Sequence, residues 1–260
     1  MICDFSPIAF QCFGLQIHWY SLAYIFGILI ATKLTECFAV KSEKPEYLTP
    51  IREFLNPAII GIIIGGRLGH VFFYGFSYYL ENYLEILKIW RGGMSFFGGF
   101  MGVILAAYIH CKNKKIDFLQ FMDLWAISAP IGLFFGRIAN FLNGELLGKA
   151  SDIAWQVVFY DGIPRHPSQL YEAFLEGVVL LLVMIFAFRK KAHKHSGMLS
   201  GIFCAGYGIA RIIGEFFREP DTMFSERLLH TYGINLNQFM SIGIVILGSI
   251  LIYRNMKKCV

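Results

Sequence analysis

The chain has 260 residues, of which 56% are hydrophobic, 17% aromatic and only 16% charged, with a formal net charge of +5 at pH 7. Soluble domains have roughly 25% charged residues, so this composition excludes an ordinary soluble globule and indicates a chain surrounded by lipid. The basic excess suits anionic lipid surfaces, and no nucleic-acid partner is expected.

The N-terminal residues and the cysteines exclude two further classes. Residues 1–16 include Asp4 and lack a basic start followed by a small-residue cleavage site, so no cleavable signal peptide is expected. The six cysteines are scattered, without a CxxC motif or a His/Cys cluster. We interpret them as small apolar residues rather than disulfides or metal ligands, and we expect no metal and no cofactor.

Seven hydrophobic stretches are long enough to cross a bilayer. We therefore expect an all-α polytopic membrane protein, organised as one domain over residues 1–260. Small residues recur four apart in several stretches, a spacing typical of closely packed membrane helices. The seven expected spans lie near residues 17–38, 57–77, 93–111, 120–142, 168–188, 197–217 and 235–253.

Two segments between the spans have their own character. Residues 77–91 are too polar to span and too aromatic for a plain loop, so they are expected to lie along the membrane interface. Residues 148–166 are punctuated by Asp, Gly and Pro and predict an external loop with a little extended structure over residues 155–160.

Basic residues are distributed unequally between the two sides that seven spans would create. The segments after the first, third, fifth and seventh spans hold thirteen Lys and Arg residues, against six on the opposite side. The positive-inside rule therefore predicts an N-terminus outside and a C-terminus in the cytoplasm.

A polar group interrupts the apolar end of the fourth span. Arg137 and Asn140 are three residues apart and share a helix face, and Asn143-Gly144 predicts the helix end. Polar residues in an apolar span are candidates for function. A forked guanidinium beside an amide suits an anion such as phosphate. The alternative is an arginine satisfied by helix carbonyls in a channel wall.

Under this topology, polar residues from six spans lie at a similar depth near the outer leaflet. A proton or ion pathway would distribute them through the whole thickness, so a cavity open to one side is predicted. The residues are Tyr20, Arg67, His70, Ser95 to Gly99, Arg137, Asn140, Gln169, Glu172, Arg211 and Glu215.

Helical spacing groups these residues further. Tyr207, Arg211 and Glu215 are four apart on one face, where an internal Arg211–Glu215 ion pair is the structural alternative. Glu172 and Glu176 continue a polar stripe after Pro167-Ser168, which resembles a helix start.

The segment GRIANFLNGELLG, residues 136–148, closely resembles the signature of the prolipoprotein diacylglyceryl transferases. Six further blocks occur in the family order, so the resemblance covers nearly the whole chain. They are residues 18–20 (HWY), 65–69 (GGRLG), 92–96 (GGMSF), 166–172 (HPSQLYE), 207–211 (YGIAR) and 215–221 (EFFREPD).

The resemblance implies seven spans, an outside N-terminus and a bacterial cytoplasmic (inner) membrane location. It implies transfer of a diacylglyceryl group from phosphatidylglycerol to the lipobox cysteine thiol of a preprolipoprotein, with release of glycerol phosphate. It implies catalytic roles for Arg137, Arg211 and Tyr20. Substrate-binding roles are expected for Arg137, Asn140, Glu145, Gly148, Tyr207, Arg67 and Glu215.

One position departs from the family pattern. Phe97 stands where the family commonly has a histidine that has been taken as the base for the thiol. His70, His18 and Tyr20 are the candidates to replace this base, and none of them is expected to act as the base. We expect the guanidinium groups to be sufficient to favour the thiolate, because a free thiol with a pKa near ~8.5 needs only a modest shift.

Other functions fit the sequence less well. The main alternative is a small membrane transporter with an outward-facing anion site, but no paired repeat or discontinuous midplane helix is evident. An intramembrane protease would need a Ser/His pair or two aspartates, and Asp123 is the only aspartate in an apolar span. A purely structural scaffold would not explain the clustered arginines. The sequence leaves the oligomeric state open.

Overall fold

The computed structural model describes residues 6, 8–12, 15–220, 231 and 233–257. They form two compact units, each described here by itself: the first takes the described residues of Met1–Phe38 and Asp123–Val260, and the second is Ala39–Met122. The single-domain organisation of the whole chain stays a prediction.

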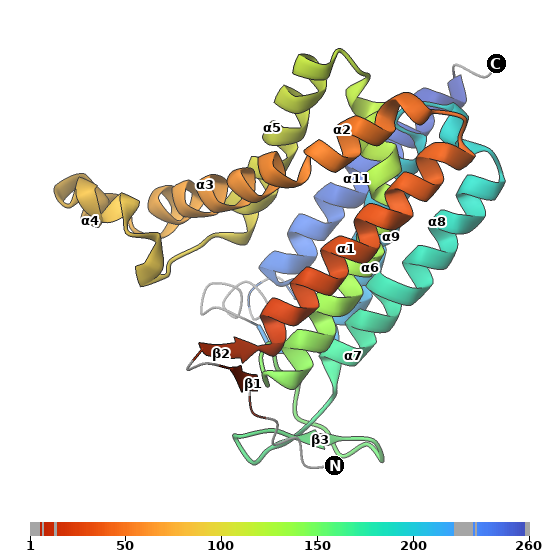
Figure 1. Cartoon of the computed structure of the whole chain (residues 1–260). Coiled ribbons are helices and arrows are strands. Elements are labelled where there is room, and N and C mark those ends of the chain that lie inside the picture. The colour runs from red at the N-terminus through yellow and green to blue at the C-terminus, as the bar shows by residue number, and fades with distance from the viewer. Residues whose placement is uncertain (1–5, 7, 13–14, 221–230, 232, 258–260) are drawn as a thin grey trace. The chain divides into compact units, whose positions relative to one another are not determined.

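The first unit is a bundle of long helices that lie side by side (Figure 1). Two small antiparallel hairpins, β1 with β2 and β3 with β4, lie at one end of this bundle. The helices are α1 (Trp19–Lys41), α6 (Phe118–Leu142), α7 (Ser168–Glu172), a π-helical segment (Ala173–Val179), α8 (Leu180–Arg189), a 3₁₀ turn (Ala192–Lys194), α9 (Met198–Glu215) and α11 (Leu236–Lys257). The strands are β1 (Ile8–Cys12), β2 (Leu15–His18), β3 (Val157–Val158) and β4 (Pro164–Arg165).

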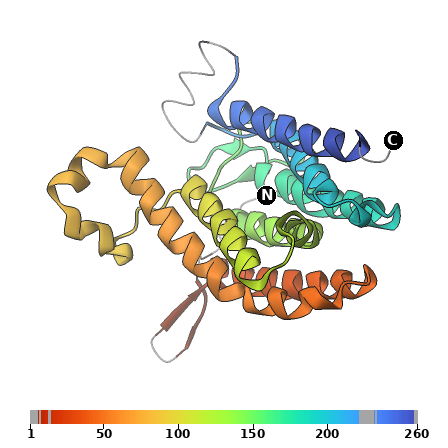
Figure 2. The same ribbon diagram turned by 90° about the horizontal axis from the view of Figure 1, so that it is seen from above.

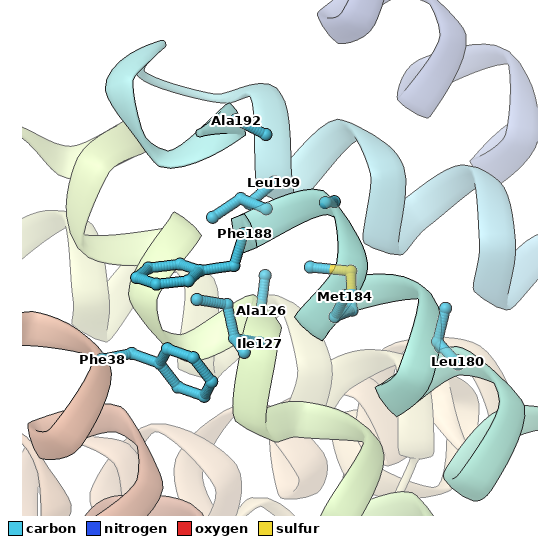
Figure 3. Packing of buried hydrophobic residues seen from close by; sticks show 9 residues of the cluster. Phe38, Ala126, Ile127, Leu180, Met184, Phe188, Ala192 and Leu199 are labelled. Carbon is cyan, nitrogen blue, oxygen red and sulfur yellow. The ribbon is translucent and has the colours of Figure 1, made fainter. Parts of the chain in front are cut away.

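The apolar core of the first unit lies at the opposite end of the bundle from the hairpins. Phe38 of α1 meets Phe188 of α8 edge to face, with ring centroids 4.6 Å apart. Ile127, Met184 and Leu199 are fully buried beside them (Figure 3). These side chains come from α1, α6, α8 and α9 and hold the bundle together at this end.

Asp123 has a structural explanation. Its carboxylate accepts hydrogen bonds from the backbone amides of Gly197 and Ser200 and from the Ser200 hydroxyl, each at 2.7 Å. These groups belong to the first turn of α9, where a buried carboxylate satisfies amides that have no partner within the helix. The lone aspartate of the fourth span therefore caps a neighbouring helix.

The second unit is built on two helices, α3 and α5, that lie side by side (Figure 2). A Cβ atom added at Gly65 would lie 2.3 Å from the carbonyl oxygen of Gly98, so only glycine allows this approach. The predicted packing role of the spaced glycines is thereby confirmed for this pair. The elements are a 3₁₀ turn (Pro45–Tyr47), α2 (Leu48–Glu53), α3 (Leu55–Tyr74), α4 (Phe76–Glu81), two 3₁₀ turns (Tyr83–Leu87 and Ile89–Arg91) and α5 (Phe96–Lys114).

Each of the seven predicted spans coincides with helix in the structure. Among the described residues, five helices are long and apolar enough to cross a membrane, namely α1, residues 55–72 of α3, α6, the continuous run of residues 168–189, and α11. The prediction of a helical polytopic membrane protein is confirmed at this level. Helices α5 and α9 fall outside the five, because glycine and polar residues interrupt their apolar sequences.

The structure also tests the predicted start of the first helix and the two predicted connecting segments. The first helix begins at Trp19, because residues 15–18 pair as strand β2. Extended structure within residues 155–160 is confirmed by β3. Residues 77–91 form short helical turns with exposed apolar side chains such as Leu87 and Trp90, at 72% and 76% exposure. Their place at a membrane interface stays a prediction.

Candidate active site

Arg137 lies in the last turns of α6 and faces two glutamates of the helix that begins at Ser168. Its Nη1 is 2.9 Å from Oε2 of Glu172, and its Nε donates to Oε2 of Glu176 at 3.0 Å. Both carboxylates are fully buried. Arg137 is therefore bound by carboxylates rather than by helix carbonyls, which excludes the channel-wall alternative for this residue.

Arg211 of α9 meets the same two glutamates from the other side. Its Nη1 donates to Oε1 of Glu172 at 2.7 Å and reaches Oε1 of Glu176 at 3.4 Å. Its Nη2 donates to Oε2 of Glu215 at 3.0 Å, one helical turn away. The internal ion pair expected from the four-residue spacing is confirmed, and it forms part of a larger cluster.

The cluster extends beyond these residues to the start of α11. Arg218, which is almost fully buried, approaches Oε1 of Glu172 at 3.5 Å. Glu215 also accepts from the side-chain amides of Asn235 and Asn237, at 3.1 and 2.9 Å. Among the described residues, three arginines and three glutamates thus share one site, and the formal charges of these six side chains sum to zero. We call Arg137, Arg211, Arg218, Glu172, Glu176 and Glu215 the arginine–glutamate cluster.

Glycines bring the helices of this cluster close together. A Cβ atom at Gly177 would lie 2.6 Å from Cβ of Phe134, so the π-helical segment lies directly against α6 one turn before Arg137. A Cβ atom at Gly214 would lie 3.1 Å from Cγ of Glu172, so α9 presses on that glutamate. Such contacts fix the guanidinium and carboxylate groups at ion-pair distance.

A second polar group lies at the same end of α6. The Tyr20 hydroxyl, at the start of α1, donates to Oδ1 of Asn140. The carboxylate of Glu145 is within hydrogen-bonding reach of the same hydroxyl. Asn140 also accepts the Glu145 backbone amide at 2.9 Å through its carbonyl, just after α6 ends. Gly144, with φ of +64°, makes this reversal possible and confirms the predicted helix end.

The loop after α6 is fixed to the segments around it. Gln169 donates its side-chain amide to the Glu145 carbonyl at 2.6 Å. Gly148 has no room for a side chain, because a Cβ atom would lie 2.1 Å from the His166 carbonyl oxygen and 3.0 Å from that of Phe217. This close approach of the backbone explains in structural terms why residue 148 is a glycine. A direct contact of Gly148 with substrate stays a prediction.

The salt bridges of the same loop reach the end of α9. Arg165 bridges Asp161 at 2.7 Å and Glu219 at 2.5 Å, and it donates to the Gly148 carbonyl at 2.8 Å. Burial opposes the charged form of Asp161, but the Ile163 amide and the Arg165 guanidinium outweigh it and lower the pKa of this carboxyl. The loop is thereby held in place beside the cluster by charges of its own.

Tyr207 lies two turns before Glu215 on α9. Its ring stacks on Phe203 with centroids 5.9 Å apart, and it packs against the apolar core. Its hydroxyl interacts electrostatically with Glu176, Arg211 and Arg137. Tyr207 therefore borders the cluster on the side of the core, as the shared face of α9 predicts.

Arg67 belongs to the second unit and has different partners. Its Nε donates to the Ile86 carbonyl at 2.9 Å, and Nη1 donates to the Gly92 and Gly93 carbonyls at 2.6 and 3.2 Å. Its Nη2 donates to the Glu85 carbonyl at 2.5 Å. Arg67 thus ties α3 to the segment before α5, and its predicted substrate-binding role has no support from these contacts.

Other residues singled out in the sequence either have a local structural role or lie outside the described part of the chain. Ser95 caps α5 by accepting from the Gly98 amide at 3.3 Å. The side chain of Phe97 and the residues 221–230, which include Asp221, lie outside the described part of the chain. The sequence analysis did not anticipate Arg218, Asn235 or Asn237 in the site. For Arg218 the signal available was its place in the family block that begins at Glu215.

The fold and the charged site together identify a class of membrane protein. The described residues form a multi-pass helical membrane protein in which a buried, charge-balanced set of arginines lies beside a tyrosine–amide–carboxylate group. Such a site can bind an anionic oxygen group by exchanging one carboxylate for it.

Comparison with known proteins gives the family. The family model for prolipoprotein diacylglyceryl transferase matches residues 7–254. The chain is similar to the phosphatidylglycerol–prolipoprotein diacylglyceryl transferase of Azospirillum brasilense, with 44% identity over 94% of this chain and 91% of the relative. It is 44% identical to the enzyme of the same name from Rickettsia rickettsii (strain Sheila Smith), over 98% of both chains. For that of Rickettsia bellii (strain OSU 85-389), the identity is 45% over 96% of this chain and 95% of the relative.

These matches span nearly the whole chain and agree with the block order seen in the sequence. The chain belongs to the prolipoprotein diacylglyceryl transferase family.

We expect the loss of a buried carboxylate of the cluster to lower the free energy of unfolding more than the loss of an exposed one. Glu172→Gln removes the charge that faces three arginines in a fully buried position. Leaving a buried ion unpaired costs about 3–5 kcal/mol, so we expect a loss of that size in the free energy of unfolding. Unfolding of the purified protein in detergent, followed by fluorescence, measures it.

Glu219→Gln is the matched control, because Glu219 also binds an arginine but is 46% exposed. Its loss should cost no more than about 1 kcal/mol. Equal losses for the two variants would show that the buried cluster does not stabilise the fold.

Proposed function

We propose that this protein transfers the diacylglyceryl group of phosphatidylglycerol to the cysteine thiol in the lipobox segment of a preprolipoprotein. The thiol loses its proton to water, a thioether forms between the sulfur and the glyceryl carbon, the bond from that carbon to the phosphate oxygen breaks, and glycerol phosphate leaves. The observation that supports this most strongly is the 44–45% identity to enzymes of this name across nearly the entire chain.

The proposal includes a finer topology than the apolar helices give. The seven predicted spans place the N-terminus outside and the C-terminus in the cytoplasm, in the bacterial cytoplasmic (inner) membrane. The arginine–glutamate cluster then lies toward the outer face, where α6 and α9 end. Phosphatidylglycerol would enter from the outer leaflet, and the lipobox segment would arrive from the same side.

Arg137 and Arg211 are assigned to the phosphate. The phosphate gains negative charge as the carbon–oxygen bond breaks, so guanidinium donors stabilise the transition state more than the bound lipid. Both arginines converge on Glu172 and Glu176 from separate helices. An anionic group that replaced a carboxylate there would therefore meet both guanidinium groups at once.

The other candidate site residues are assigned to supporting roles around the phosphate site. Tyr20, Asn140 and Glu145 form a chain of polar groups at the end of α6, and we assign them to the head group of the lipid and to the approaching thiol. Glu215 holds Arg211 in place by an ion pair, and Tyr207, which interacts electrostatically with Arg211, is assigned to the border of the site.

The transporter alternative gains no support from the relatives, all of which have transferase names. The deciding experiment uses purified protein, phosphatidylglycerol with a labelled acyl chain and a peptide that contains a lipobox cysteine. Formation of a labelled thioether supports the proposal. Its absence, together with uptake of an anionic solute by vesicles that hold the protein, would favour the transporter.

Replacement of Arg137 tests the phosphate assignment. Arg137→Ala should lower the transfer rate by at least about a hundredfold, which corresponds to about 2.7 kcal/mol of barrier. Arg137→Lys should recover little, because an ammonium lacks the two-pronged donor geometry. The initial rate of thioether formation measures both.

Arg189→Ala provides the control, since Arg189 is exposed at the end of α8 and distant in sequence from every cluster residue. It should transfer at the wild-type rate. Near-normal turnover in Arg137→Ala would exclude this arginine from phosphate binding.

Topology gives an independent test in a background without native cysteines. Gln156→Cys should react with a membrane-impermeant thiol reagent added to intact cells from outside. Lys114→Cys and His193→Cys should react only after the membrane is opened, because both lie in basic segments predicted to be cytoplasmic. The reverse pattern would overturn the predicted orientation. Position 226, which is also predicted to be outside, lies beyond the described residues.

Phe97 tests the need for a base. If the guanidinium groups favour the thiolate sufficiently, the wild-type protein transfers lipid and Phe97→His changes the rate only modestly. If His70 or His18 substitutes for the base, its alanine variant should lose activity and Phe97→His should restore it. A gain of about a hundredfold, or about 2.7 kcal/mol of barrier, from Phe97→His alone would show that a base is required.

A further inference from the structure

The arginine–glutamate cluster is electrically balanced before any substrate arrives. Its three guanidinium groups and three carboxylates are paired, and the three glutamate side chains are 0% exposed. The arginine side chains are 13%, 9% and 4% exposed. A phosphodiester carries one negative charge, so its arrival gives the buried site an excess of one negative charge.

An uncompensated charge in a buried site is strongly unfavourable, and a carboxyl group in that position takes up a proton instead. The excess can therefore be removed if one of the three glutamates becomes neutral. The glutamate most readily neutralised is the one that keeps no other partner when Arg137 and Arg211 bind the phosphate.

The contacts distinguish the three carboxylates. Glu172 would keep Arg218, which approaches it at 3.5 Å. Glu215 would keep the two amides of Asn235 and Asn237, at 3.1 and 2.9 Å. Glu176 contacts only Arg137 and Arg211 among the described residues, and two of its three contacts are long, at 3.4 Å.

We propose that Glu176 takes up one proton when an anionic phosphate group binds to Arg137 and Arg211, and releases it when the phosphate leaves. This rests on the proposed function, in which these two arginines bind the phosphate of the lipid. The proton comes from water on binding and returns to water on release, so charge and atoms balance over the cycle.

The surroundings of Glu176 support this assignment. The charged or titratable groups that face it are Arg137 of α6, Arg211 and Tyr207 of α9, and Glu172 one turn earlier on its own helix. Among these neighbouring groups, only Glu172 could take up the proton instead, since tyrosine is already neutral. Glu176 also lies in the π-helical segment, and π-helical turns are frequent at functional sites.

The first experiment measures proton uptake in the wild-type protein. Binding of phosphatidylglycerol to the detergent-solubilised protein is followed by calorimetry at pH 7 in two buffers that differ in ionisation enthalpy. We expect uptake of about one proton per lipid bound and none for diacylglycerol, which lacks the phosphate. The dissociation constant should correspondingly rise with pH, by up to tenfold per unit. Binding without proton uptake would overturn the proposal.

The second experiment identifies the carboxyl group without changing the charge balance. Infrared difference spectra of the lipid-bound against the lipid-free protein should show a new band from a protonated carboxylic acid. Its frequency should shift in Glu176→Asp and stay unchanged in Glu172→Asp and Glu215→Asp. A shift in Glu172→Asp or Glu215→Asp in place of Glu176→Asp would assign the proton elsewhere and overturn the proposal.

The calorimetry of the wild-type protein remains decisive if a variant fails to fold. It also separates the two hypotheses. A protein that neither binds phosphatidylglycerol nor forms thioether contradicts the proposed function. A protein that does both without proton uptake contradicts only the role of Glu176.

Discussion

The structure of the first unit depends on the pairing of three arginines, two of them buried and Arg137 only 13% exposed, with three buried glutamates. Ions of this kind remain charged inside a membrane protein only when each has a partner. The pairing joins α6, the helix that begins at Ser168 and α9, while Glu215 joins α11 through two asparagine amides. The apolar core forms the other end of the same bundle. The helices are thus fixed at one end by packing and at the other by charge.

This constraint bears on the catalytic role proposed for the arginines. A free guanidinium would lower the pKa of a nearby thiol and attract a phosphate at any time. In a balanced cluster its charge is already compensated by a carboxylate, so its effect on a ligand depends on how readily that carboxylate gives way. Glu176 has the fewest partners among the three glutamates, and two of its three contacts are 3.4 Å long, which favours it as the member that gives way. The same pairing therefore stabilises the empty site and limits which ligands can enter it.

The sequence was sufficient for those features that depend on local pattern. Each stretch that hydropathy selected is largely helical, Gly144 predicted the end of α6, and the four-residue spacing indicated the Arg211–Glu215 pair. It could not show that Arg137 binds Glu176, because that contact depends on how closely two helices pack. The approach is set by Gly177 against Phe134, a relation between surfaces that the periodicity of either helix does not contain. Asn235 and Asn237 were missed for the same reason.

Arg67 and Arg137 show that two arginines in similar sequence surroundings can be held by different kinds of partner. Both follow glycine in an apolar helix, and both looked like ligands for an anion. Arg67 donates to four backbone carbonyls, which cannot leave without unfolding the segment before α5. Arg137 is held by side-chain carboxylates, which can rotate away or become neutral on protonation while the backbone stays in place. An exchangeable partner is therefore the feature that distinguishes Arg137 from Arg67 and that the proposed phosphate binding requires. In the described part of the chain, the arginines bound to Glu176 have such a partner.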